Sequence, residues 1–258
     1  MCQLLCATGR EQTDLTDMLR MFARGSRFHK HGWGLADLNP GESRVIKSPD
    51  PALTSPLFAK MLTRGFVSKN AFAHLRYATI GDIELSNTHP FAARDNTGRE
   101  WVLMHQGTVF EFEAADSYFY TQIGTTDSER ILLYLLDRVN TGAVKKGGAL
   151  SANERFSLLD KEIRRMAPGN KLNLAIYDGE LIYLHSNYAD SLYLQRINRV
   201  LLLCSVPLTE NGIWQPLPLN TLFALKDGEV VRRGTAHGNT YIDSEEDIKL
   251  LYALYANL

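Results

Sequence analysis

The chain has 258 residues, of which 45% are hydrophobic and 22% are charged, so it can bury a substantial core. Its 28 basic and 29 acidic residues give a formal net charge of -1, which argues against electrostatic binding to nucleic acid or to an anionic membrane. The most apolar stretch, residues 200–206, is much shorter than the ~20 apolar residues that cross a bilayer. These features predict a soluble protein.

The amino terminus has no basic segment followed by an apolar run, so we expect no secretory signal. The three cysteines, Cys2, Cys6 and Cys204, are sparse and odd in number, which is typical of a reducing compartment without a disulfide framework. We therefore expect a cytoplasmic protein.

Apolar residues recur at helical spacing in residues 15–22 and in residues 53–62, and a glycine follows each segment. Thr126 and Ser151 each precede a Glu by three residues, and these two capping boxes predict two more helices. A last helix is expected near residues 244–254. The predicted helices are thus grouped in the middle of the chain, with predicted strands on either side.

Short apolar or alternating runs predict strands over residues 4–7, 33–38, 71–77, 101–105, 172–177, 181–185, 200–206, 221–225 and 229–232. Asp178-Gly179 and Asp227-Gly228 each lie between two such runs and predict hairpins. The Gly- and Lys-rich stretch 141–149 is interpreted as a surface loop and not as a domain boundary. We expect one α+β domain, residues 1–258, with helices packed on the outer faces of antiparallel sheets.

Cys2 is the residue that carries most chemical information. Removal of Met1 would place a thiol and a free α-amino group on Cys2, so that a nucleophile and its base share one residue. A cysteine that merely follows the start codon is the alternative, and position alone does not decide between the two.

Other chemistry has little support in the sequence. Cys2-x-x-x-Cys6 is a poor zinc spacing, and His29-x-His31 has no third ligand nearby, so we expect no metal site. The sequence contains no Gly-x-Ser-x-Gly elbow, no phosphate-binding loop of the Gly-x4-Gly-Lys-Ser/Thr type and no Gly-x-Gly-x-x-Gly after a strand.

Polar clusters lie at the ends of several predicted strands, in residues 74–79, 87–91, 105–107 and 124–129. With Cys2 ahead of them, the order Arg-Tyr-Ala-Thr, Asn-Thr-His-Pro-Phe, His-Gln-Gly and Thr-Asp-Ser-Glu resembles the class II glutamine amidotransferases, which are N-terminal-nucleophile hydrolases. The small stand-alone members are the most similar. The resemblance covers nearly the whole chain and includes Gly32-Trp33-Gly34, residues 172–179, and residues 205–209 followed by Trp214.

The resemblance implies a four-layer αββα sandwich of two stacked antiparallel sheets. It also implies that Cys2 is the nucleophile and that the backbone N–H of Gly107 donates to the oxyanion. Gln106 stands where the family has asparagine, and its amide is one methylene further from the backbone, about 1.5 Å. A second departure is Ile80, at a position where synthase members often have histidine.

Four residues are expected to bind substrate. By the resemblance, Arg76 would hold an α-carboxylate and Asp127 an α-ammonium, with Tyr77 and Thr79 lining the pocket. Each has a plainer interpretation as well: an ordinary ion pair for Arg76, a helix-start carboxylate for Asp127, and strand packing for the other two. Gly107 could likewise be a simple turn glycine.

The expected activity is hydrolysis of the side-chain amide of glutamine or of a γ-glutamyl compound through a Cys2 thioester. No cofactor and no metal are implied, and no binding to nucleic acid or membrane. The amidase domain would take up the chain, so an ammonia-accepting partner subunit or a larger γ-glutamyl substrate is expected. The alternative is a non-catalytic glutamine-binding or regulatory subunit, which the substitution at Gln106 keeps open.

Overall fold

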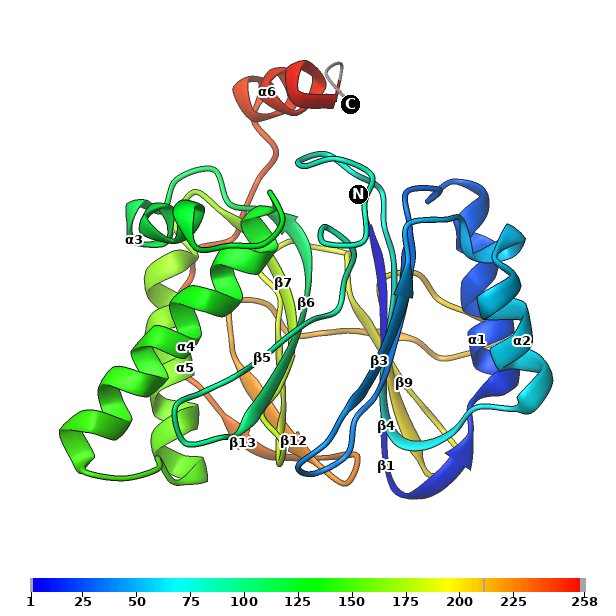
Figure 1. Ribbon diagram of the computed structural model, residues 1–258, viewed down its shortest axis with the longest axis horizontal. Helices are drawn as coiled ribbons and strands as arrows, with labels where there is room; N and C mark the ends of the chain where they lie inside the picture. The colour runs from blue at the N-terminus through cyan, green and yellow to red at the C-terminus, as the bar shows by residue number, and fades with distance from the viewer. Residues whose placement is uncertain (1, 211, 256–258) are drawn as a thin grey trace.

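Two β-sheets lie face to face, and helices cover the outer face of each, so the protein has four layers in the order α, β, β, α (Figure 1). This computed structural model describes residues 2–210 and 212–255. One helical layer holds α1 (Thr16–Ala23) and α2 (Pro56–Arg64), and the other holds α4 (Asp127–Lys146) and α5 (Ala152–Met166). The expected αββα sandwich is confirmed.

The first sheet has seven strands in the order β11-β9-β10-β1-β4-β2-β3. Its strands are β1 (Gln3–Asp14), β2 (Trp33–Asp37), β3 (Arg44–Ser48), β4 (Val67–Leu75), β9 (Tyr193–Ile197), β10 (Val200–Cys204) and β11 (Gln215–Pro216). Its neighbouring strands pair antiparallel. Strand β1 is the central strand. Cys2 directly precedes it and therefore lies at the end of this central strand.

The second sheet has six strands in the order β13-β12-β8-β7-β6-β5, again antiparallel. Its strands are β5 (Phe91–Arg94), β6 (Glu100–Thr108), β7 (Lys171–Tyr177), β8 (Ile182–His185), β12 (Phe223–Lys226) and β13 (Glu229–Arg233). The two expected hairpins join β7 to β8 and β12 to β13. Asp227 (φ 56°) and Gly228 (φ 76°) are both left-handed, as a two-residue type I′ turn requires.

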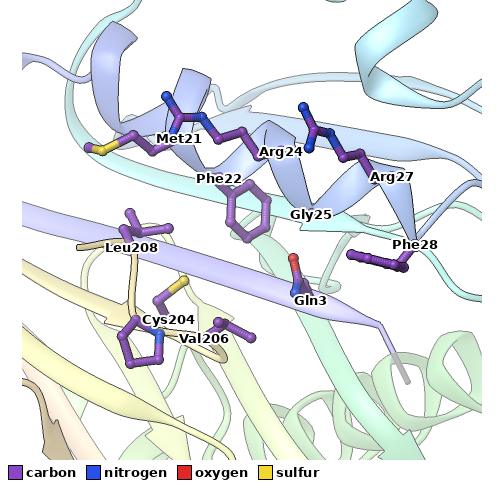
Figure 2. Close-up of a pocket in the computed structure, with 11 residues that line it drawn as sticks. Gln3, Met21, Phe22, Arg24, Gly25, Arg27, Phe28, Cys204, Val206 and Leu208 are labelled. Atoms are coloured by element: carbon purple, nitrogen blue, oxygen red, sulfur yellow. The ribbon is translucent and has the colours of Figure 1, made fainter. Parts of the chain in front are cut away.

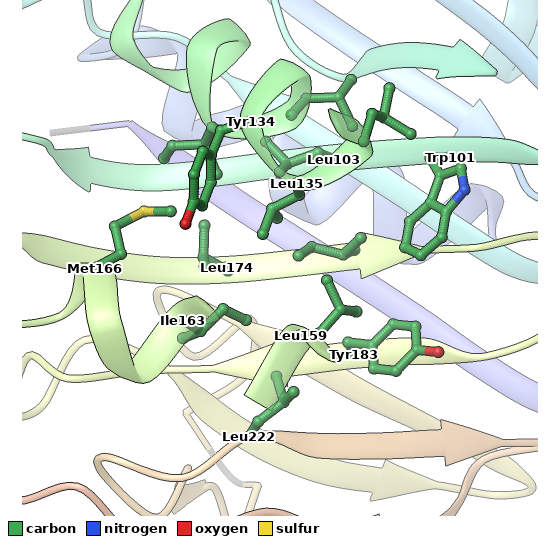
Figure 3. Packing of buried hydrophobic residues seen from close by; sticks show 14 of the residues in the cluster. Trp101, Leu103, Tyr134, Leu135, Leu159, Ile163, Met166, Leu174, Tyr183 and Leu222 are labelled. Atoms are coloured by element: carbon green, nitrogen blue, oxygen red, sulfur yellow. The ribbon is translucent and has the colours of Figure 1, made fainter. Parts of the chain in front are cut away.

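Each interface between layers has its own apolar core. Between the sheets, side chains such as Leu4, Phe72, Met104 and Leu184 interdigitate. The six-stranded sheet packs on α4 and α5 through a second cluster, shown in Figure 3, to which Trp101 and Leu103 of β6 contribute beside side chains of both helices. A third cluster, around Trp33 and Phe58, joins the seven-stranded sheet to α1 and α2. Because side chains alternate along a strand, neighbouring buried residues of one strand face different interfaces.

The surface loop expected over residues 141–149 is wrong, because α4 continues through Lys146. The helical spacing of Val139 and Ala143, both buried, carries the helix past Thr141. A Cβ at position 142 would lie 3.1 Å from the Leu150 side chain. Glycine at this position of the helix therefore permits close packing against Leu150. The helix ends at Gly147, which is left-handed (φ 75°).

The capping box expected at Thr126 forms only in part. The Thr126 hydroxyl accepts from the backbone N–H of Glu129, but the Glu129 carboxylate turns instead to the N–H groups of Ile123 and Gly124. Ser151 and Glu154 form the full box at the start of α5. Glu129 therefore anchors the loop ahead of α4.

Several elements were not predicted. They are β3, β5, β9, β11, the short α3 (Glu113–Asp116) and the 3₁₀ turns η1 (Arg24–Arg27), η2 (Ala52–Thr54) and η3 (Ser117–Tyr120). These segments are short, and the edge strand β3 is only partly buried, so they carry weak periodic signals. The closing helix was predicted and is α6 (Glu245–Tyr255). Among the described residues, no helix is long and apolar enough to cross a membrane.

Candidate active site

Strand register places Cys2 in the space between the two sheets. Gln3 pairs with Leu75 and Leu4 with His74, so the same register brings Cys2 opposite Arg76, just beyond the end of β4. Leu4 and Cys6 both pack between the sheets, and alternation along the strand gives Cys2 the same orientation. The Cys2 thiol donates to the carbonyl oxygen of Tyr77 and accepts from its N–H, both at 3.4 Å.

The environment of the Cys2 thiol acts on its acidity in two directions. Protein atoms crowd the thiol of this half-buried residue, and this desolvation raises its pKa. The hydrogen bond from the Tyr77 backbone and the positive charge of Arg76 lower the pKa and so oppose the effect of burial. A base close to the thiol is therefore needed to form the nucleophilic thiolate at neutral pH.

Gln106 reaches the same space from the opposite sheet. Val102 and Met104 of β6 pack between the sheets, so alternation turns Gln106 the same way. Its side-chain Nε2 donates to the backbone carbonyl oxygen of Cys2 at 2.8 Å. Glutamine is one methylene longer than asparagine, and at this length the Gln106 side chain bridges the two sheets at Cys2, the residue expected to be the nucleophile.

Gly107 follows Gln106 and pairs with Leu172 of β7. A Cβ at this position would lie 1.8 Å from the carbonyl oxygen of Lys171 and 2.6 Å from Nε2 of His105. No side chain fits there without moving the backbone of β7. Glycine is therefore required by the strand packing beside Cys2, whatever else its N–H does.

Arg76 is almost fully buried, with 2% of its surface exposed. Its Nη1 donates to the carbonyl oxygen of Asp82 at 2.7 Å, and its Nη2 donates to those of Ile80 and Gly81 at 3.0 and 2.7 Å. Burial lowers its pKa, with the negative charge of Cys2 and nearby carboxylates opposing this. The 80–82 loop thus folds over the guanidinium, whose positive charge also acts on the Cys2 thiol.

Asn87 connects that loop to the start of α4, a role that the sequence did not reveal. Its Nδ2 donates to the carbonyl oxygen of Asp82 at 3.0 Å, and its Oδ1 accepts from the N–H of Thr125 at 2.7 Å. Residue 87 belongs to the Asn-x-His-Pro motif, whose spacing was the available signal. The loop over Arg76 and the helix that carries Asp127 are held together in this way.

Asp127 is in the first turn of α4 and is 6% exposed. Its two carboxylate oxygens accept from the N–H groups of Val109 and Ser128 at 2.8 and 2.9 Å. Val109 directly follows β6, so Asp127 joins the helix to the end of the strand that holds Gln106 and Gly107. The Ser128 hydroxyl also donates to Oδ1, at 3.4 Å, so Oδ2 is the oxygen that keeps capacity to accept a further donor.

Tyr77 and Thr79 are half-buried residues of the segment after β4. His31 fixes this segment: its N–H donates to the carbonyl oxygen of Arg76 at 3.1 Å, and its ring Nδ1 accepts from the N–H of Ala78 at 2.9 Å. Its ring lies 5.3 Å from that of Tyr77. The His29-x-His31 pair, considered for metal binding, thus packs on the backbone that holds the Cys2 thiol.

Within the described residues, no group of three or more His, Cys, Asp or Glu side chains could hold a metal ion. Cys6 and Cys204 are buried, and burial raises the pKa of both thiols, that of Cys204 to about 12. Cys2 is the more accessible thiol among the three.

A cavity of about 350 Å³ lies on the other face of the seven-stranded sheet, under α1 and η1 (Figure 2). Gln3 and Cys204 line it together with Phe22 and Phe28, and Gln3 comes from the strand position next to Cys2. Since adjacent strand residues face opposite sides, this cavity is separate from the space that Cys2 faces.

Two stacked antiparallel sheets with helices on both outer faces define the class of fold, and comparison with known proteins gives the family. The family model described as "Glutamine amidotransferases class-II" matches residues 1–199. The chain therefore belongs to the class II glutamine amidotransferases. The family resemblance expected from the ordered motifs is confirmed.

Curated relatives carry the same family description. A "Putative glutamine amidotransferase" of Haemophilus influenzae is 26% identical over 257 residues, with 90% of this chain and 86% of the relative covered. "Putative glutamine amidotransferase YafJ" of Escherichia coli is 28% identical over 187 residues, with coverage of 70% and 71%.

Solved structures share the fold. A "predicted glutamine amidotransferase" from Pseudomonas aeruginosa has a TM-score of 0.62 at 21% identity, covering 90% of this chain and all of that one. The phosphoribosylpyrophosphate amidotransferase of Bacillus subtilis has a TM-score of 0.65 at 14% identity, and the match covers 90% of this chain but 48% of that one. At these identities the likeness concerns the fold alone.

Proposed function

We propose that this protein is a cysteine-dependent amidohydrolase that cleaves the side-chain amide of glutamine or of a γ-glutamyl compound. The observation that carries the proposal is the convergence of three groups from both sheets: the Cys2 thiol, the Arg76 guanidinium and the Gln106 amide. A nucleophile beside a cation and an amide donor suits attack on a carbonyl group. Membership of the family supports glutamine as the substrate class.

The reaction would begin once Met1, which lies outside the described residues, has been removed. The Cys2 α-amine takes the thiol proton, and the thiolate forms a C–S bond with the amide carbonyl. Gly107 N–H donates to the oxyanion, together with the second Nε2 hydrogen of Gln106, the one that is not bonded to the Cys2 carbonyl. The C–N bond breaks, ammonia or an amine leaves with the transferred proton, and water hydrolyses the γ-glutamyl thioester to glutamate and free thiol.

Substrate recognition would use the groups around the 80–82 loop. Arg76 takes the α-carboxylate and Asp127 the α-ammonium, while Tyr77 and Thr79 line the pocket. Arg76 donates to three loop carbonyls, so a carboxylate that binds both of its terminal nitrogens must replace at least one of these contacts. Asp127 keeps free acceptor capacity and needs no such exchange.

A partner subunit that accepts ammonia, or a larger γ-glutamyl amide hydrolysed directly, remains part of this proposal. The rival function is a glutamine-binding subunit without catalysis. The hydrogen bond from Gln106 Nε2 to the Cys2 carbonyl supports this rival function, because the hydrogen in that bond is not available to an oxyanion. Location in the cytoplasm is likewise a prediction, based on the sparse cysteines.

The proposal is tested by screening glutamine and a panel of γ-glutamyl amides for release of ammonia or amine. We expect wild-type turnover on at least one compound, its loss in Cys2→Ala and its retention in the matched control Cys6→Ala. Binding of glutamine by calorimetry without any turnover would instead establish the binding subunit.

A further inference from the structure

Gln106 belongs to a network of hydrogen-bonded buried polar side chains, which leads from the Cys2 backbone to strand β7 of the six-stranded sheet. Asn173 of β7 is its cross-strand partner and is fully buried. The Asn173 Nδ2 donates to the Gln106 Oε1 at 3.3 Å and to the Ser191 hydroxyl at 2.9 Å. These hydrogen bonds matter because a buried polar group is costly unless it is hydrogen-bonded.

The donor and the acceptor of each hydrogen bond in this network follow from the carbonyl oxygens at its two ends, those of Tyr188 and Cys2. The Ser191 hydroxyl donates its only hydrogen to the carbonyl oxygen of Tyr188, which can only accept, so Asn173 must present its NH₂ group to Ser191. The Ser186 hydroxyl donates to the Asn173 Oδ1 at 2.7 Å, in agreement with this orientation. Asn173 therefore has its second N–H for Gln106.

The orientation of Gln106 is fixed in turn. Because Gln106 receives a hydrogen from Asn173 through Oε1, its Nε2 must point the other way, toward Cys2. The Cys2 carbonyl oxygen is an acceptor only, so the reversed amide would bring two oxygens together. We propose that Asn173 is a positioning residue that, through Gln106, holds the backbone of Cys2 and aims the Gln106 amide hydrogens at the reacting centre.

The predicted change in kcat rests on the proposed function, whereas the predicted orientation of the Gln106 amide does not. Asn173 touches neither thiol nor substrate, so its loss should lower kcat and leave KM within about two-fold. We expect Asn173→Ala to lower kcat about ten-fold, the effect of one misplaced hydrogen bond. Asn173→Asp should lower it further, because a carboxylate can only accept and would turn the Gln106 Nε2 away from Cys2.

Ser191→Ala is the matched control. It removes a hydrogen bond of the same network, but the Ser186 hydroxyl still donates to Asn173 Oδ1 and so keeps the Asn173 N–H directed at Gln106. It should destabilise the fold about as much as Asn173→Ala and lower kcat less than two-fold. Equal kcat losses in these two alanine variants would overturn the positioning role. Asn173→Ala measures the effect even if Asn173→Asp fails to fold.

A readout that does not need turnover separates this inference from the proposed function. In protein labelled with ¹⁵N-glutamine, the Gln106 side-chain NH₂ should exchange slowly with solvent in the wild type and in Ser191→Ala. It should exchange at least ten-fold faster in Asn173→Ala, because the amide is then free to rotate. Unchanged exchange there would contradict the inference, whereas an inactive wild type with the expected exchange would contradict only the proposed function.

Discussion

The guanidinium of Arg76 donates a hydrogen bond of 2.7 Å to the carbonyl oxygen of Gly81. With the bonds to Ile80 and Asp82, three of its five N–H groups are used by its own loop, including both hydrogens of Nη2. A carboxylate that binds both terminal nitrogens must therefore displace loop carbonyls. In the proposed binding mode, the 80–82 loop and the substrate carboxylate would therefore compete for the same donors.

Arg76→Ala should consequently reduce both stability and catalysis. The sequence alone predicts a change that harms turnover far more than folding, but the burial of this side chain under the loop alters that expectation. Loss of the donors to three carbonyls should lower the free energy of unfolding by about 1–3 kcal/mol, and kcat/KM should fall at least about ten-fold. Urea unfolding and steady-state kinetics on the same preparation measure both, and unchanged stability would show that the loop does not depend on Arg76.

Gln106→Asn tests the bridge to Cys2. By family resemblance, asparagine would restore the usual oxyanion donor and raise glutamine hydrolysis. The structure predicts the opposite sign, because a side chain shorter by about 1.5 Å cannot span the 2.8 Å contact from Gln106 Nε2 to the Cys2 carbonyl. We expect kcat to fall about ten-fold, as in Asn173→Ala. Faster hydrolysis by Gln106→Asn would contradict the bridging role and would show that the side chain at position 106 acts only as an oxyanion donor.

Gly107→Ala should disrupt the end of β6. Its Cβ would meet the Lys171 carbonyl at 1.8 Å, a backbone atom that cannot turn aside. We expect a loss of about 1–3 kcal/mol in the free energy of unfolding and no measurable amidase activity. Gly148→Ala, where nothing lies within 4 Å, is the control and should change neither quantity. Wild-type stability in Gly107→Ala would mean that β6 and β7 are further apart than the structure shows.

Buried histidines predict the response to acid. Burial lowers the pKa of both His74 and His185 to about 3, whereas an unfolded histidine titrates near 6.5. Between these values the unfolded state binds more protons, so the free energy of unfolding falls as the pH falls from about 6.5, by up to ~1.4 kcal/mol per pH unit for each histidine. Urea midpoints at pH 7.5 and 5.0 measure the loss, which should be smaller in His74→Phe than in the wild type. An equal loss in both would show that His74 does not contribute.

The sequence was informative where local chemistry and periodicity coincide. The order of the motifs indicated the family, and the αββα layers followed from that resemblance. The Ser151 capping box and the two Asp-Gly hairpins followed from local sequence. It could not show that Arg76 is covered by its own loop, because this depends on how residues 80–82 fold. Nor could it show that Gln106 reaches Cys2, since that contact joins two sheets whose separation is set by packing.

The Glu129 carboxylate illustrates the same limit. Its spacing from Thr126 predicts a reciprocal cap, but the loop at Ile123 and Gly124 offers competing N–H donors. Likewise, no role for His31 could be predicted from the His29-x-His31 pattern, and only the tertiary structure shows its contact with Ala78. Local rules fail here because tertiary contacts compete for the same polar groups.

Covalent labelling of the native protein with an electrophilic glutamine analogue, followed by intact-mass and peptide-mass analysis, tests the central claim most directly. The account predicts a protein mass that lacks Met1 and gains one label per chain, with the label on Cys2 and absent in Cys2→Ala. A retained Met1, a label on Cys6 or Cys204, or equal labelling of Cys2→Ala would contradict it.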